Sequence, residues 1–186
     1  MWRTLRSLAL AGLLPALPAL ATEGPPPILN PYRAASADGR WVLQVDPSDL
    51  LGRGPADYRM EREGRVAWTN RLPFTLWEAV VAADGRVAGY AYTHGWRGFA
   101  KNGYRAGMGE FIVTLLAPTG AIVRQQAEPR EQSRYLHTPP NPLALGIRLE
   151  ESERRFLVAT ADPDVNRRRE RWTAYDLEGG RPQRSA

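Results

Sequence analysis

The 186-residue sequence contains no cysteine, and this single absence excludes several kinds of chemistry. Disulfide bonds, thiolate metal sites, a cysteine nucleophile and a lipid-anchored cysteine are all ruled out. The folded chain must therefore be stabilised by burial of its own apolar side chains, and its length suits one domain with a sizeable core.

Long hydrophobic runs are also absent, with one exception at the N-terminus. An apolar stretch extends from Leu8 to Leu20; Arg3 and Arg6 precede it, and the small-x-small sequence Ala19-Leu20-Ala21 ends it. This pattern predicts a signal peptide over residues 1–21, cleaved near Ala21, and hence export to the periplasm or to the outside of the cell. The stretch is too short to cross a bilayer of about 30 Å as a helix, and no second run reaches that length, so we expect no transmembrane segment.

Excess charge of one sign is small. Removal of the leader, with its two arginines, lowers the formal net charge from +5 to +3. Nucleic-acid binders usually concentrate more positive charge on one surface, so we expect no nucleic-acid partner. The arginine-rich stretch 167–171 is interpreted as part of a solvated loop. No cofactor is expected.

Helical periodicity is nearly absent after residues 22–30, a Pro-rich segment that we interpret as a flexible lead. Short runs of strand-forming residues alternate instead with turn sequences, which predicts an all-β, antiparallel fold. The run Phe74–Ala82 is long and mostly apolar, as is typical of a strand buried on both faces. The other predicted strands are Trp41–Val45, Tyr58–Arg62, Arg65–Thr69, a strand that begins at Val87, Phe111–Leu116, Ala121–Gln125, Leu145–Arg148, Phe156–Thr160 and Trp172–Leu177.

Glycine-containing turns recur along the chain in a regular order. Asp38-Gly39 and Asp84-Gly85 each precede a strand, and each strand is followed by a loop, a second strand, a glycine turn and a third strand. Asp-Gly suits tight hairpins because glycine has no Cβ and tolerates positive φ angles. We therefore predict one domain over residues 31–186, made of three modules at about 31–70, 71–127 and 141–186, each with about four strands and resembling a propeller blade.

The run Ala35–Leu43, with the sequence Ala-Ser-Ala-Asp-Gly-Arg-Trp-Val-Leu, resembles the hairpin opening of blades in TolB-type exported β-propellers. The resemblance implies stacked four-stranded antiparallel sheets. Because closed propellers use about four to eight blades, three modules suggest a homo-oligomer that completes a ring, or an open stack within a larger envelope assembly. A β-sandwich with a similar number of strands is the alternative fold.

The long connections between predicted strands are where we expect function, because loops carry binding and catalytic residues more often than the scaffold does. Both histidines lie in such connections, His94 in one and His137 in another. Aromatic side chains beside them offer flat surfaces for a sugar ring or a peptide side chain, and basic or amide groups offer hydrogen-bond donors. The ligand-binding candidates are His94, Trp96, Arg97, Lys101, Asn102, Tyr104, Tyr135 and His137.

Two kinds of catalytic site are the alternatives to a binding face. A metal site would need a third ligand beside the two histidines, and no spacing selects among Asp46, Glu78 and Asp162, so we expect no metal. Glu78 and Glu110 lie near predicted strands and are candidates for a carboxylate pair in glycoside hydrolysis.

These patterns favour an exported, non-enzymatic binding or interaction module for an unknown protein or glycan ligand. The alternative is a periplasmic or secreted hydrolase of glycans or peptides that uses a histidine with a carboxylate.

Overall fold

The computed structural model describes residues 27–95, 99–101, 104–106, 109–129, 142–161 and 170–183. Regular structure in these ranges is β-strand, apart from one turn of 3-10 helix at Glu151–Glu153. No helix in this part of the chain is long and apolar enough to cross a membrane. The predicted signal peptide lies outside the described residues, as does most of the Pro-rich lead.

The first sheet, called sheet 1, is a four-stranded antiparallel meander. Its strands are paired in the order β1-β2-β3-β4. Side chains along a strand alternate between its two faces, and the buried residues of β2 and β3 alternate in this way, so one face of sheet 1 is apolar and the other is polar. The strands are β1 (Tyr32–Ala35), β2 (Trp41–Pro47), β3 (Ala56–Arg62) and β4 (Arg65–Leu72).

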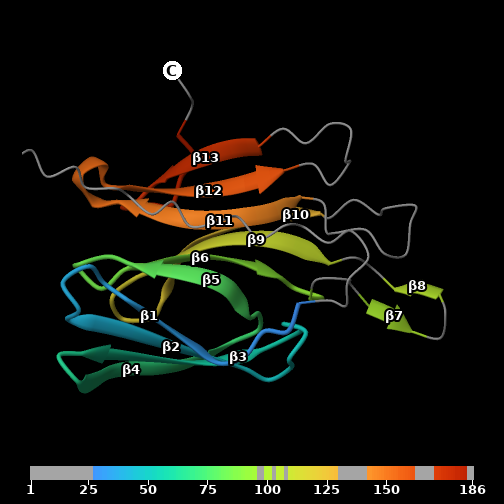
Figure 1. The fold of residues 1–186 in the computed structure, drawn as a ribbon, viewed down its shortest axis with the longest axis horizontal. Coiled ribbons are helices and arrows are strands. Elements are labelled where there is room, and N and C mark those ends of the chain that lie inside the picture. The colour runs from blue at the N-terminus through green and yellow to red at the C-terminus, as the bar shows by residue number, and fades with distance from the viewer. Residues whose placement is uncertain are drawn as a thin grey trace, which may run out of the picture.

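Sheet 2 is also four-stranded and antiparallel, in the order β10-β9-β6-β5. Every residue of β6 is buried, because both faces of this sheet are packed against a neighbour. A short hairpin, β7–β8, is inserted between β6 and β9 and lies beyond the ends of the sheets in Figure 1. The strands are β5 (Leu76–Val81), β6 (Val87–Tyr92), β7 (Phe99–Lys101), β8 (Tyr104–Ala106), β9 (Glu110–Leu116) and β10 (Ile122–Pro129).

Sheet 3 has three described strands, β11 (Leu143–Glu150), β12 (Arg155–Ala161) and β13 (Glu170–Asp176). The third module was predicted with about four strands. After β13 the chain does turn back along it, but the pairing is limited to the bridge between Tyr175 and Pro182 and a hydrogen bond from the N–H of Gln183 to the carbonyl of Ala174 (2.7 Å). Proline has no N–H to donate, so it does not support a regular ladder at this position.

The three sheets are stacked in layers, with sheet 2 in the middle (Figure 1). One apolar core lies between sheets 1 and 2 and includes Leu43, Met60 and Leu116. The second lies between sheets 2 and 3 and includes Phe156, with its ring stacked on Tyr175. The first strands of the sheets meet, because β5 contacts both β1 and β11. The predicted all-β fold of antiparallel sheets is confirmed, and the stack fits both a propeller-like arrangement and a sandwich.

Glycine turns of sheet 2 pack directly on tryptophan rings of sheet 1. Gly85, in the turn between β5 and β6, has a φ of +88°, and a Cβ added to it would lie 2.7 Å from the ring of Trp41. Gly120, in the turn between β9 and β10, has a φ of +82°, and its Cβ would lie 2.8 Å from the ring of Trp68. Glycine is needed at both positions, for the backbone conformation and for the close approach.

A tyrosine hydroxyl joins sheet 1 to the first strand of sheet 2. The Tyr58 hydroxyl donates to the carbonyl of Phe74 (2.9 Å) and accepts a hydrogen bond from the N–H of Leu76 (2.9 Å). All three residues are buried. The hydroxyl therefore satisfies two backbone groups at the beginning of β5 that have no water to bond.

A second hydroxyl joins sheet 2 to the first strand of sheet 3 in the same way. Tyr92 donates to the carbonyl of Pro142 (3.2 Å) and accepts from the N–H of Ala144 (2.7 Å). In both cases the two backbone groups are two residues apart at the start of the next sheet. We call Tyr58 and Tyr92 the tyrosine clamps.

Candidate functional site

The long connections leave the sheets at one end of the stack, and the short glycine turns lie at the other end. This follows from the meanders: the β2–β3, β6–β9 and β12–β13 connections join equivalent neighbouring strands. Figure 1 shows the β7–β8 hairpin at this end. We call the surface formed by the β2–β3 and β6–β9 connections, together with the start of β11, the long-loop face.

His94 joins the long connections of sheets 1 and 2. It forms an isolated antiparallel bridge with Arg53, from the β2–β3 connection. The N–H of Gly54 also contacts the carbonyl of Thr93 (3.4 Å), and the Thr75 hydroxyl donates to the carbonyl of Gly54 (3.0 Å). Loops that are about forty residues apart in the sequence are therefore held together by backbone contacts.

The side chains beside His94 form a shallow, polar hollow that includes an ion pair. Arg53 donates to Asp49 through two nitrogens, Nε to Oδ1 (3.0 Å) and Nη2 to Oδ2 (2.6 Å). The hydrogen bonds from Arg53 lower the pKa of Asp49, so its carboxylate stays ionised. The hollow is lined by Asp49, Arg53, Gly54, Pro73, Thr93 and His94.

Two other candidates lie on the β7–β8 hairpin. Lys101 is paired with Tyr104 across the hairpin, so the two occupy directly opposite positions. Five further predicted ligand-binding residues lie outside the described residues. They are Trp96, Arg97, Asn102, Tyr135 and His137.

The start of sheet 3 also reaches the long-loop face. Pro142 and Ala144, where the chain enters β11, are held by the clamp of Tyr92, two residues before His94. All three sheets therefore contribute backbone to this end of the molecule.

The acidic candidates are spread over different parts of the fold. Glu78 lies on β5 between sheets 2 and 3, and Asp46 is exposed on the outer face of sheet 1. Glu110 begins β9, where its N–H bonds to the Thr93 hydroxyl (2.8 Å) beside His94, and its side chain is exposed. Asp162 lies outside the described residues. Within the described ranges, no three His, Cys, Asp or Glu side chains are grouped to hold a metal ion.

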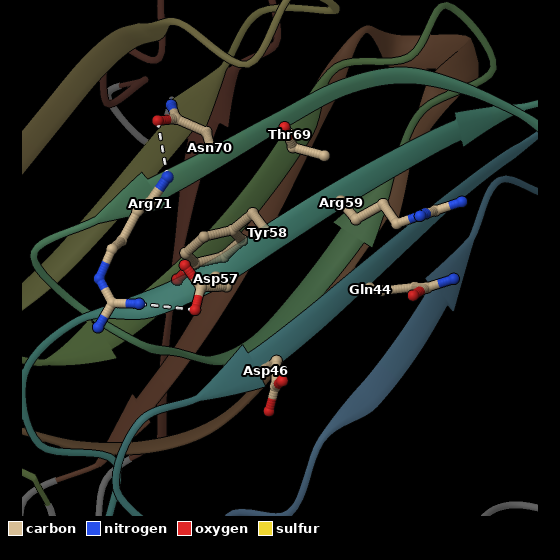
Figure 2. A pocket seen from close by; sticks show the side chains of 8 residues that line it. All are labelled: Gln44, Asp46, Asp57, Tyr58, Arg59, Thr69, Asn70 and Arg71. Carbon is tan, nitrogen blue, oxygen red and sulfur yellow. Dashed lines mark hydrogen bonds and ion pairs between the residues drawn. The ribbon is translucent and has the colours of Figure 1, made fainter.

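Sequence reasoning missed a second polar hollow, on the outer face of sheet 1 (Figure 2). Asp46 of β2 is directly opposite Asp57 of β3, and Asp57 forms an ion pair with Arg71 of β4 (2.6 Å). The signal was the alternation of polar residues on three neighbouring strands. Exposed ion pairs of this kind contribute only about 0–1 kcal/mol. The residues that line this hollow are Gln44, Asp46, Asp57, Tyr58, Arg59, Thr69, Asn70 and Arg71.

Comparison with known proteins adds no family to these observations: no protein-family model matches the chain, and no curated protein is significantly similar to it.

Proposed function

We propose that this protein is an exported, non-enzymatic binding module that holds its ligand on the long-loop face. The observation that carries the proposal is the bridge between Arg53 and His94, which fixes loops of two sheets side by side. Binding sites are often built from loops of separate elements that a rigid scaffold positions together. The clamp of Tyr92 adds the start of sheet 3 to the same end.

The charge of the β6–β9 connection favours an anionic ligand. Residues 94–109 contain three basic residues, Arg97, Lys101 and Arg105, and no Asp or Glu. Two of these basic residues, Lys101 and Arg105, belong to the β7–β8 hairpin. Guanidinium and ammonium groups bind carboxylate and phosphate oxygens through charge-assisted hydrogen bonds. We infer that the ligand is an acidic glycan or an acidic peptide of another envelope or extracellular protein.

Reversal of charge on the hairpin tests this proposal. Lys101→Glu combined with Arg105→Glu should weaken binding by about tenfold or more, since two reversed charges at about 1 kcal/mol each sum to about 2 kcal/mol. The measurement is calorimetric titration with oligogalacturonate and oligoglutamate, and with uncharged maltooligosaccharide and Gly-Ser peptides for comparison.

The matched control has the same change of net charge at the opposite end of the stack. Arg65→Glu combined with Arg181→Glu alters two exposed residues beside the short turns and should leave the affinity for the acidic probes within about twofold. Binding of neither acidic probe by the natural chain, or equal losses in the two double variants, would refute the proposal.

The hydrolase alternative requires His94 or His137 to act with a carboxylate. The carboxylate of Asp49, in the same hollow as His94, already accepts two hydrogen bonds from Arg53. This arrangement supports a binding role for the hollow. The acidic probes also test the alternative: release of shorter sugars or peptides during incubation would favour hydrolysis, and their recovery intact would favour binding.

A further inference from the structure

Glu78 is a half-buried acid in the contact between sheets 2 and 3. The pairing of β5 with β6 skips Trp77, because Leu76 is opposite Ala91 whereas Glu78 is opposite Tyr90. This bulge re-aims the side chains that follow it. The Tyr90 hydroxyl donates to Glu78 Oε2 (3.2 Å).

The carboxylate of Glu78 also faces the backbone of β11. Glu78 Oε2 is the one atom within 4 Å of the position that a Cβ on Gly146 would take, at 3.8 Å. The N–H of the next residue, Ile147, bonds to the Glu78 carboxylate. The pairing of β11 with β12 is itself irregular between Ala144 and Gly146. A bulge on each strand therefore brings the Glu78 side chain against the first strand of sheet 3.

No cation faces Glu78 among the described residues. The titratable groups that interact with Glu78 from β1 and β6 are the tyrosines Tyr32 and Tyr90, which are neutral. From β11 the charged neighbour is Arg148, but its guanidinium lies 4.6 Å from the ring centroid of Trp172 and pairs with Glu150. Since side chains alternate along a strand, this places Arg148 on the face of sheet 3 turned away from Ile147.

Burial raises the pKa of Glu78, and the hydrogen bonds from Tyr90 and Ile147 only partly oppose this effect. An unfolded glutamate titrates near about 4.3. Between that value and its higher value in the folded protein, the folded chain holds a proton that the unfolded chain has lost. The free energy of unfolding therefore falls as the pH rises through this window.

We propose that the contact between β5 and β11 is a proton-controlled joint, in which ionisation of Glu78 loosens the docking of sheet 3 on sheet 2. The protonated carboxyl needs no counter-ion in this interface, whereas the carboxylate must regain solvation, and water reaches it when β11 moves away. The strand whose docking changes is β11, which follows the connection of residues 130–141. Its existence does not depend on which ligand the long-loop face binds.

Hydrogen exchange of the full mature chain tests the joint at about pH 4.5, near the pKa of an unfolded glutamate, and at about pH 7.5, where an unperturbed glutamate is fully ionised. After correction for the intrinsic pH dependence of exchange, the protection of peptides from β11, relative to peptides from β3, should be severalfold lower at the higher pH than at the lower pH. Glu78→Gln, which mimics the protonated acid, should abolish this difference. Glu110→Gln, at an exposed acid of the same sheet, should leave it unchanged.

The same pH response in Glu78→Gln as in the natural chain would overturn the proposal. If Glu78→Gln does not fold, the natural chain alone tests the proposal. A ratio of β11 protection to β3 protection that is the same at both pH values would also overturn the proposal.

Discussion

Gly85→Val is expected to lower the free energy of unfolding by about 3–5 kcal/mol. The φ of +88° at Gly85 is strained for a β-branched residue, and the new side chain would overlap the ring of Trp41, which a Cβ alone would approach to 2.7 Å. Trp41 is a buried member of the core between sheets 1 and 2, so a shift of its ring would disturb the packing of that core. Urea denaturation followed by circular dichroism measures the loss.

Gly39→Val is the matched control for backbone strain alone. Gly39 has a φ of +69°, but no atom lies within 4 Å of an added Cβ, so we expect a loss of only about 1–2 kcal/mol. Equal losses in the two variants would mean that the turn at Gly85 does not pack on Trp41. A Gly85→Val protein as stable as the natural one would show that the turn itself is wrongly placed.

Tyr58→Phe is expected to cost about 2–4 kcal/mol although it removes one oxygen atom and leaves the ring in place. The change leaves the Leu76 N–H and the Phe74 carbonyl buried without their hydrogen-bond partner. An unpaired buried polar group costs about 1–3 kcal/mol. Two such groups lose their partner in this variant. The same urea denaturation, at neutral pH, gives the difference.

Tyr175→Phe controls for the loss of a tyrosine hydroxyl as such. The Tyr175 ring is buried and stacked on Phe156 with centroids 5.1 Å apart, and its hydroxyl forms no hydrogen bond within the described residues. We expect a change of less than about 1 kcal/mol. If the two variants lose similar amounts, the tyrosine clamps contribute nothing specific to the docking of sheets.

The strands and turns were predictable because their signals are local. Asp38-Gly39 and Asp84-Gly85 combine a glycine that accepts positive φ with an aspartate that bonds the backbone two residues later, and both form tight turns in the structure. The long apolar run of β5 was also visible. By contrast, β1 and the β7–β8 hairpin were not predicted, because runs of three or four residues carry too little alternation to stand out.

The candidate site was predictable only as a set of loops. His94 was selected because it lies in a long connection, but its neighbours Arg53 and Asp49 come from a connection of another sheet. Nothing in the local sequence records such a pairing, which depends on how the sheets stack. The same limit applies to Glu78, whose environment is set by β11 and not by its sequence neighbours.

The central claim is that stacking of the sheets brings loops of different sheets together at one end, and a disulfide trap tests it directly. Arg53→Cys combined with His94→Cys places two thiols at bridged positions in a chain with no other cysteine. Paired residues of antiparallel strands have Cα atoms roughly 4.5–5.5 Å apart, within the range of a disulfide. Under mild oxidation the pair should close within one chain, detected as a loss of two hydrogens by mass spectrometry. Thiols that stay free, or that close no faster than in Arg65→Cys combined with His94→Cys, would contradict the account.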